Sequence, residues 1–185
     1  MAAEHRKLKL GKGAGAFVKR RLLWLPQQDV AREVDFCPLP DILQGHDLWL
    51  GMVVSYRDGS ILAQEIVEQP PDVNDLGTLL ANSMKSPLTD DHHGCPRTVY
   101  LRDNPEWQGL FPHLKQLKIE VVVTEALPHW DQAVEEFIRY MQDWRSVYGK
   151  EKTLSESQLG YRDELFDLQI TAILFPSNRR KWSMK

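Results

Sequence analysis

Extended and helical apolar patterns alternate between residues 47 and 148, and this order constrains the fold more than any other feature of the sequence. Residues 47–56 and 61–69 are apolar and rich in β-branched side chains, which is typical of strands. The Asp58–Gly59 pair between them is a strong hairpin signal, because glycine tolerates the backbone angles of a tight turn. The sequence therefore predicts two antiparallel strands joined by a short turn.

Helices and strands are expected to alternate after this hairpin. Leu76, Leu79, Leu80 and Met84 recur at helical spacing, with Asp72 or Asn74 available as the N-cap. Further strands are expected over 96–103 and over 118–125, the second of them buried. Between them Asn104 begins a helical stretch that Gly109 and Pro112 break into two short pieces, and the best amphipathic helix runs from Pro128 to its stop at Gly149.

This order predicts an α/β domain with a mixed sheet that begins with a β-hairpin, continues as alternating helices and strands, and carries a C-terminal helical extension. We expect a basic, disordered tail over 1–21, the α/β domain over 22–150, a C-terminal element packed on it over 151–178, and a second basic tail over 179–185. Helix and strand both remain open for the apolar part of 151–178.

Composition places the chain among ordinary globular proteins. It has 185 residues, 42% hydrophobic and 26% charged, so it buries a core without help from disulfides or metals. Its two cysteines, Cys37 and Cys95, do not resemble a secreted scaffold. No run reaches the ~18 apolar residues of a membrane helix, and no signal-peptide pattern is present. These features predict a cytoplasmic protein with no transmembrane segment.

Charge is distributed unevenly along the chain. Residues 1–21 and 179–185 together carry +10, whereas the body between them carries −13. Such ends suit contacts with phosphates, anionic lipid or an acidic partner, although tails that only aid solubility are the alternative. The candidate binding residues are Arg6, Lys7, Lys9, Lys19, Arg20, Arg21, Arg179, Arg180, Lys181 and Trp182.

The stretch TDDHHGC, residues 89–95, gathers more reactive groups than any other. Adjacent His92 and His93 point in different directions in most backbones, and no metal-ligand spacing accompanies them. Cys95 next to histidines is weak evidence for a nucleophile. The stretch is therefore interpreted as a polar loop, and we expect no catalytic residue, no metal and no cofactor. Metal and nucleophile remain the alternatives.

Asp103 is the other candidate for a site. It ends a predicted strand and precedes a helix, which is where ligands bind in open α/β sheets. A role in capping the next helix is the alternative. The possible ligand site consists of Asp103 with His92 and His93.

Two blocks of the sequence, WLGMVVSYRDGSILAQEIVEQPPDVNDLGTLLANSMKSP and CPRTVYLRDNPEWQGLFPHLKQLKIEVVVTEALPHWDQAVEEF, resemble a domain-of-unknown-function family common in cyanobacteria. The features that carry the resemblance are the tryptophan before the D-G hairpin, the P-R-T-V-x-L-R-D strand and the segment L-K-I-E-V-V-V. The resemblance covers about residues 49–137. It implies a fold and no established activity.

The order of elements is also similar to half of a ribonuclease H-like fold, as in integrases. In that fold one acid lies on a strand and a second acid ends a later strand. By this resemblance Asp103 corresponds to the second acid, while the first falls near Ser55, which has no carboxylate. The resemblance therefore implies a relative that lacks its first catalytic acid.

The sequence as a whole predicts a non-catalytic interaction or regulatory protein, acting on a nucleic-acid-processing partner such as a ribonuclease. A metal-dependent hydrolase or nuclease that uses Asp103 with His92 or His93 is one alternative. Weak binding of RNA or DNA through the basic tails is another. The identity of a protein partner and the oligomeric state are left open.

Overall fold

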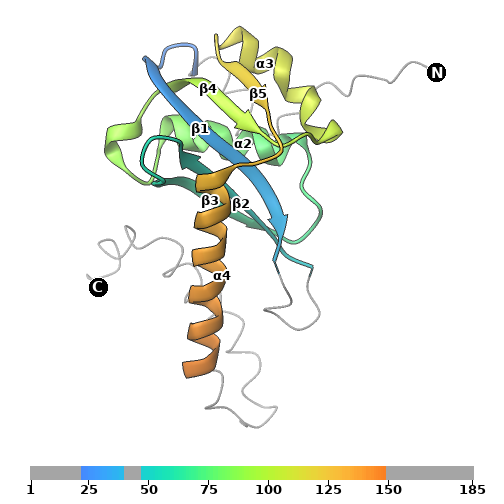
Figure 1. Ribbon diagram of the computed structural model, residues 1–185. Helices are drawn as coiled ribbons and strands as arrows, with labels where there is room; N and C mark the ends of the chain where they lie inside the picture. Colours follow the sequence, from blue (N-terminus) through green and yellow to red (C-terminus); the bar gives the residue numbers. More distant parts are fainter. Residues whose placement is uncertain (1–21, 40–46, 149–185) are drawn as a thin grey trace, which may run out of the picture. The chain divides into compact units, whose positions relative to one another are not determined.

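The computed structural model describes residues 22–39 and 47–148, with Asp90 and the last five residues described by their backbone alone. In this part of the chain five strands form one mixed sheet in the order β3-β2-β1-β4-β5 (Figure 1). Their bounds are β1 Gln27–Pro38, β2 Trp49–Ser55, β3 Ile61–Val67, β4 Cys95–Leu101 and β5 Glu120–Val123. Strand β2 runs antiparallel to both neighbours, whereas β1, β4 and β5 are mutually parallel.

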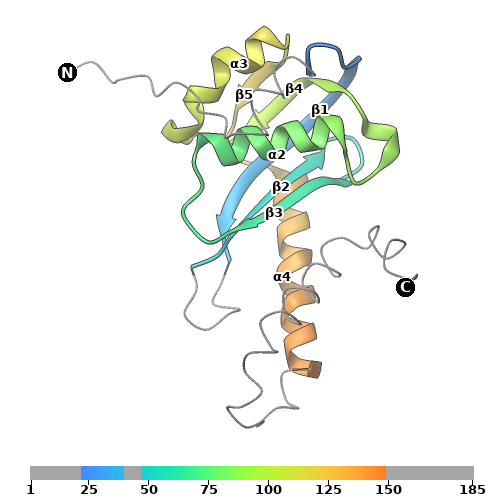
Figure 2. The same cartoon turned by 180° about the vertical axis from the view of Figure 1, so that it is seen from behind.

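Helices cover both faces of this sheet (Figures 1 and 2). The helical elements are α2 Val73–Lys85, η1 Asp90–His92, η2 Pro105–Leu110, α3 Phe111–Gln116 and α4 Pro128–Tyr148. Helices α2 and α3 and the turn η2 pack on one face, while the first turns of α4 pack on the other. The predicted α/β class with a mixed sheet is therefore confirmed, and so is the hairpin, which is formed by β2 and β3.

Strand β1 was missed by the sequence analysis, although it is the longest strand of the described residues and occupies the middle of the sheet. Its sequence QQDVAREVDFCP places Arg32, Glu33 and Asp35 in the half that is buried. Charged side chains are depleted from central strands, so the pattern does not predict one. The sheet thus begins one strand before the predicted hairpin.

Local signals account well for the helix that follows the hairpin. The side chain of Asp72 accepts hydrogen bonds from the backbone N–H groups of Asn74 and Asp75, and the side chain of Asp75 accepts one from the backbone N–H of Asp72. This capping box satisfies amide groups that the first helical turn leaves unpaired. Of the two residues predicted as N-cap candidates, Asp72 and Asn74, the structure uses Asp72.

The stretch between β4 and β5 is divided as predicted. Asn104 caps η2 by accepting from the backbone N–H of Glu106, and α3 begins at Phe111 with Pro112 in its first turn. Strand β5, in contrast, was predicted to be buried and is not, because it lies at the edge of the sheet. Glu120 and Val123 are exposed there, the latter to 45%.

Two apolar clusters hold the sheet between its helices. The cluster under α2 and α3 includes Val34, Phe36, Val53, Val99, Leu101, Leu76, Leu80, Trp107 and Leu114. The cluster under α4 includes Leu50, Met52, Val54, Leu127, Trp130 and Val134. Alternate residues of each central strand therefore point to opposite clusters, as the two-residue period of a strand requires.

Several predictions concern residues that lie outside the described ranges. These are the two basic tails, the stop of α4 at Gly149 and the C-terminal element over 151–178. Within the described ranges, the helices are too short or too polar to cross a membrane.

Candidate functional site

The central strand buries three charged side chains within four consecutive residues, 32–35. Arg32 and Glu33 are fully buried and Asp35 is 5% exposed. Because strand residues alternate, Arg32 faces the α2 side of the sheet, while Glu33 and Asp35 face the α4 side. Burying a charge is costly unless it is paired and hydrogen-bonded, so the role of each of these side chains depends on its partners.

Arg32 is held by carbonyl oxygens. Its guanidinium donates to the backbone oxygens of Ser83 at 2.9 Å, His92 at 2.6 Å and Gly94 at 2.9 Å, and also to the Ser83 hydroxyl at 3.1 Å. Desolvation by burial lowers the pKa of Arg32 to about 10, which leaves it charged near neutral pH. The side chain therefore ties the end of α2 and the loop before β4 to the middle of the sheet.

This loop is the TDDHHGC stretch, and its backbone turns inward toward Arg32. Gly94 has a φ of +145°, and a Cβ there would lie 2.7 Å from the carbonyl oxygen of Pro26. His93 is exposed, while Nε2 of His92 lies 3.7 Å from the carboxylate of Asp58 in the hairpin turn. The loop's carbonyl groups thus have a structural role, while its imidazoles point elsewhere.

Glu33 receives the N-terminus of α4. Its Oε2 accepts from the backbone N–H of Trp130 at 2.6 Å, where the helix dipole favours a negative charge. Desolvation raises the pKa of Glu33, and the N–H groups of Trp130 and His129 oppose this shift. Its Oε1 is buried and has no hydrogen-bond partner among the described residues.

Asp35 lies in a cluster with Arg102 and Asp131, which we call the carboxylate–arginine cluster. Arg102 donates to Oδ2 of Asp35 at 2.8 Å and, through its other terminal nitrogen, to Oδ1 of Asp131. The indole N–H of Trp107 donates to the second oxygen of Asp35 at 3.3 Å. The guanidinium also lies over the ring of Trp130, with 4.9 Å between the guanidinium carbon and the ring centroid.

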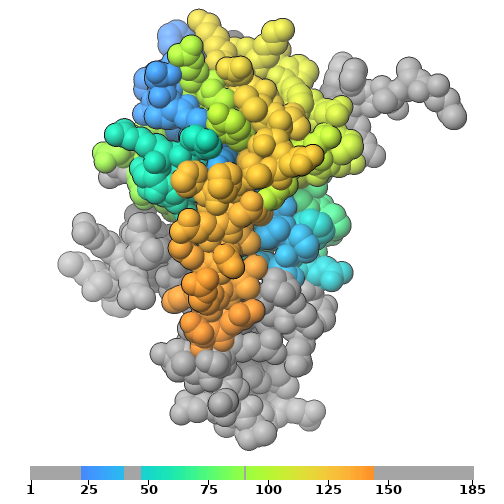
Figure 3. Space-filling model, viewed as in Figure 1, coloured from blue at the N-terminus to red at the C-terminus, as the bar shows by residue number. Residues whose placement is uncertain are grey.

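The position of this cluster in the sheet is the usual position of ligand sites in open α/β folds. Arg102 follows the last residue of β4, and β4 is the parallel neighbour of β1 at the point where the strand order reverses. Asp131 reaches the same point from the first turn of α4. The first turns of α4 lie over this face of the sheet (Figure 3).

The charged groups of the cluster pair with one another. Burial lowers the pKa of Arg102, but its hydrogen bonds and charge interactions with Asp35 and Asp131 outweigh this and raise it overall. Asp35 is nearly inaccessible, whereas the side chains of Arg102 and Asp131 are 30% and 50% exposed. The space between two carboxylates, which suits a cation, is therefore filled by a cation of the chain itself.

The structure does not bring the sequence-predicted site residues together. His92 and His93 precede β4, whereas Asp103 follows it, so the seven-residue strand separates them by roughly 20 Å. Asp103 is exposed and adjacent in sequence to Arg102. Among the described residues, no three His, Cys, Asp or Glu side chains are arranged to hold a metal ion.

Sequence analysis missed Asp35, Arg102 and Asp131 as a cluster. They come from strand β1, the residue after strand β4, and helix α4, and the sequence separation of 67 residues between Asp35 and Arg102 offers no local signal. By the integrase resemblance the first acid was placed near Ser55, which ends β2. Asp35 lies on the neighbouring strand β1, ahead of the hairpin. The alternation of Arg32, Val34 and Phe36 with Glu33 and Asp35 was the available signal.

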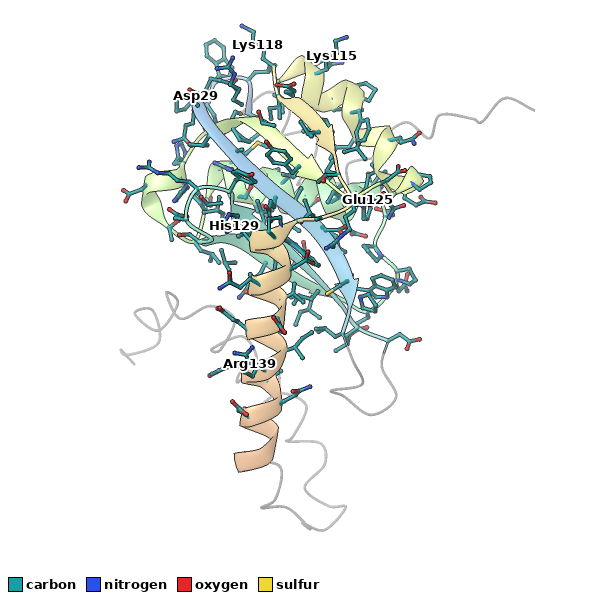
Figure 4. The ribbon with its side chains drawn as sticks, viewed as in Figure 1. Asp29, Lys115, Lys118, Glu125, His129 and Arg139 are labelled. Atoms are coloured by element: carbon teal, nitrogen blue, oxygen red, sulfur yellow. The ribbon has the colours of Figure 1, made fainter. Side chains whose placement is uncertain are left out.

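A group of aromatic side chains lies beside Glu33 on the same face. The rings of Tyr56 and Tyr100 stack with 4.9 Å between centroids, and His129 meets Tyr56 edge-on at 5.5 Å. His129 stands at the start of α4 (Figure 4). Stacking leaves no room between the rings, so this group closes the face over Glu33.

Fold and cluster together define a class: a five-stranded α/β domain of order 3-2-1-4-5 with an arginine held between carboxylates where the strand order reverses. The chain belongs to the family described as "Domain of unknown function (DUF6930)", whose model matches residues 18–138. The match extends further toward the N-terminus than the expected 49–137 and includes β1. No curated protein matches the chain by sequence.

Three of the solved structures that match the chain are retroviral proteins. The HTLV-2 integrase catalytic core domain in complex with magnesium is 11% identical, with a TM-score of 0.50 over 70% of this chain and 79% of that one. The catalytic core of BIV integrase is 13% identical, with a TM-score of 0.43 over 70% and 78%. A chain of the simian T-cell lymphotropic virus intasome in complex with PP2A regulatory subunit B56 gamma is 13% identical, with a TM-score of 0.48.

The chain spans less than half of that intasome chain, since 70% of this chain matches 46% of the other. At such identities the likeness to the HTLV-2 core extends to the fold alone. It agrees with the resemblance to a ribonuclease H-like fold stated from the order of the elements.

Proposed function

We propose that the chain is a non-catalytic interaction or regulatory protein, in which the carboxylate–arginine cluster stands where a related fold would place a metal-dependent site. The observation that supports this is the guanidinium of Arg102, which donates to both Asp35 and Asp131. A fixed charge between two carboxylates holds the sheet and α4 together. It does not activate water or polarise a substrate as a metal ion does.

Metal-assisted phosphoryl chemistry needs carboxylate oxygens that converge on an ion and remain free to bind it. The HTLV-2 core is a structure in complex with magnesium. In this chain both oxygens of Asp35 are occupied, one by Arg102 and one by Trp107. Asp103, the nearest further carboxylate in sequence, is exposed beyond the end of β4. These contacts favour a structural role for the cluster over a hydrolytic one.

The proposed interaction role rests on the distribution of charge along the whole chain. The basic ends, +10 in total, suit charge-assisted contacts with an acidic surface, while the −13 body repels nucleic acid. An acidic protein that itself processes nucleic acid, such as a ribonuclease, is a partner consistent with both the basic ends and the acidic body.

Catalysis is tested with the full-length protein and Mg²⁺ or Mn²⁺ added to labelled single- and double-stranded oligonucleotides. We expect no turnover above a blank and no stoichiometric Mn²⁺ uptake by calorimetry. The matched variants are Asp35→Asn and Asp103→Ala. Turnover that the wild-type protein shows reproducibly, and that either variant abolishes, would establish an enzyme and end the proposal.

The partner is tested by capture from a native lysate with the full-length chain and with a variant in which Arg179, Arg180 and Lys181 are replaced by glutamine. Each capture is repeated after nuclease treatment. A protein retained by wild type after nuclease, and weakened in the variant, supports the proposal. Loss of every protein on nuclease treatment would assign the basic ends to nucleic acid instead.

A further inference from the structure

Strand β5 (Glu120–Val123) ends the sheet on one side, and no strand of the described residues pairs with its outer edge (Figure 1). The edge at β3 is different, because the backbone N–H of Leu88 donates to the oxygen of Leu62 there at 2.8 Å. A strand edge with unpaired N–H and C=O groups is a template for another strand. The open edge of the described sheet is therefore that of β5.

The hydrogen bonds between β4 and β5 identify the backbone groups that face outward. The N–H of Thr124 donates to the oxygen of Leu101 at 2.9 Å, and Leu101 is the register partner of Val123. In a parallel ladder every second residue directs both its N–H and its C=O to the same neighbour, so Val122 bonds to β4 as Thr124 does. Val121 and Val123 therefore direct theirs away from β4, and no backbone bond from another described residue reaches them.

The side chains along this edge are apolar and β-branched. Val121 packs against the core under α2 and α3, and Val123, on the same face of the sheet, is 45% exposed. Val122 lies on the opposite face. Edges that avoid pairing often carry lysine or proline, and the three valines offer neither obstacle.

We propose that β5 pairs with β5 of a second copy of the chain, antiparallel about a twofold axis at Val122. A twofold axis perpendicular to the sheet keeps each face continuous across the junction. The hydrogen-bonded pairs of an antiparallel ladder need outward groups on both strands, so Val121 lies opposite the partner's Val123 and the reverse. Two such pairs exchange four N–H···O=C bonds, and Val122 lies opposite the partner's Val122 between them.

The same register suits the side chains of both copies. Glu120 lies opposite the partner's Thr124, so no like charges oppose each other across the junction. The exposed side chain of Val123 is covered by the partner's Val121 on the same face. The edge is thus complementary to itself, which is what a twofold dimer requires. These residues lie apart from the carboxylate–arginine cluster, and the pairing does not depend on its role.

A neighbouring register is excluded by a bond within the chain. An axis at Val121 would place Val123 opposite the partner's Ile119. The N–H of Ile119 already donates to the oxygen of Leu114 at 3.0 Å, so it has no donor to offer. An axis at Glu120 would set two like charges directly opposite each other, which is destabilising.

The register is tested by mild oxidation of full-length Val122→Cys at low micromolar concentration. The two positions form a non-hydrogen-bonded pair with Cα atoms about 4.5 Å apart, a separation that a disulfide spans. We expect a covalent dimer that wild type does not form under the same oxidation. Glu120→Cys is the matched control, because its two copies lie about 13 Å or more apart along the junction and should not crosslink.

Association without a crosslink is measured by sedimentation velocity over a concentration series. A contact of this size predicts a weak dimer, with a dissociation constant on the order of 10–100 μM. Val123→Pro removes an outward N–H and leaves the bonds to β4 intact, so it should weaken association about tenfold or more. Val123→Thr keeps the N–H and the β-branched shape, and should change it less than about twofold.

Circular dichroism of each variant shows whether the fold is retained, and the crosslinking test does not depend on the proline variant. A crosslink in Val122→Cys and not in Glu120→Cys, with weaker association of Val123→Pro, supports the pairing. Three results would overturn it: no crosslink in Val122→Cys, equal crosslinking of Glu120→Cys, or association of folded Val123→Pro that equals wild type.

Discussion

Arg102 is the residue on which the two carboxylates of the site depend. Removing it leaves Asp35 buried with only the Trp107 indole as a partner. Truncating one member of a buried pair typically costs 3–5 kcal/mol, but Arg102 is 30% exposed, so water offsets part of this loss.

We therefore predict that Arg102→Ala lowers the free energy of unfolding by about 2 kcal/mol. Asp131 is half exposed, so Asp131→Asn should cost less than about 1 kcal/mol. Urea denaturation followed by circular dichroism measures both. Equal costs for the two variants would show that Asp35 does not rely on Arg102.

Arg32 presents a different kind of buried charge, with acceptors that are neutral. Replacing it by methionine leaves the carbonyl oxygens of His92 and Gly94 without this donor, in a site closed to water. We predict that Arg32→Met lowers the free energy of unfolding by about 3 kcal/mol, against less than about 0.5 kcal/mol for Arg97→Met on the surface. The same denaturation curves decide it; a small effect at Arg32 would mean that the loop holds its conformation unaided.

At the scale of elements, the sequence predicted the features that rest on a local signal, apart from the burial of β5. The hairpin at Asp58–Gly59 and the capping box at Asp72 follow from nearest neighbours in the chain. Strand β1 could not be predicted in this way, because its charged residues become acceptable only through partners far away in sequence. Arg32 needs α2 and the loop, and Asp35 needs Arg102. The carboxylate–arginine cluster could not be predicted for the same reason.

Helix α4 is attached to the sheet through a carboxylate whose pKa is raised. Desolvation destabilises the charged form of Glu33, with His129 and Asp131 as the nearby ionisable groups. A raised pKa in the fold means that Glu33 favours folding most when protonated. This contribution is present below the unfolded-state pKa and is lost as pH rises through the folded-state value.

We expect the unfolding free energy of Glu33→Gln, relative to that of wild type, to be higher at pH 7.5 than at pH 4.5. A difference in unfolding free energy measured at both values tests this sign. Asp58 provides the contrast, since hydrogen bonding from Ser60 lowers its pKa to about 2. A variant difference that is the same at both pH values would contradict the burial of a charged Glu33.

The loop before β4 depends on one glycine. Gly94 combines a positive φ with a close approach to Pro26, so a side chain is both strained and obstructed there. We predict that Gly94→Ala costs about 2 kcal/mol of stability. Gly109→Ala is the matched control, because its nearest neighbour would be Val73 Cγ2 at 3.4 Å. Thermal unfolding of both variants shows the difference; similar midpoints would reject it.

For the molecule as a whole, the two thiols report on global opening. Cys95 is 2% exposed in the core under α2, and Cys37 packs on the opposite face of the sheet. Burial raises the pKa of both, that of Cys37 to about 11, so little thiolate is present at pH 8.

Cys95 should therefore react with an aromatic disulfide reagent only as fast as the domain unfolds, and Cys37 faster but well below a free thiol. Absorbance of the released thiolate gives the two rates, and Cys37→Ser isolates that of Cys95. Rapid labelling of Cys95 in the native protein would mean that the core under α2 opens locally.

Arg32 also sets how the TDDHHGC loop responds to acid. A guanidinium loses its ion pair with a carboxylate when the carboxylate is protonated, but carbonyl oxygens do not titrate. The three carbonyls that hold Arg32 therefore offer no group for acid to discharge, and its own pKa of about 10 lies far on the alkaline side. The loop is therefore held to the sheet at acidic and at neutral pH by contacts whose acceptors do not change with pH.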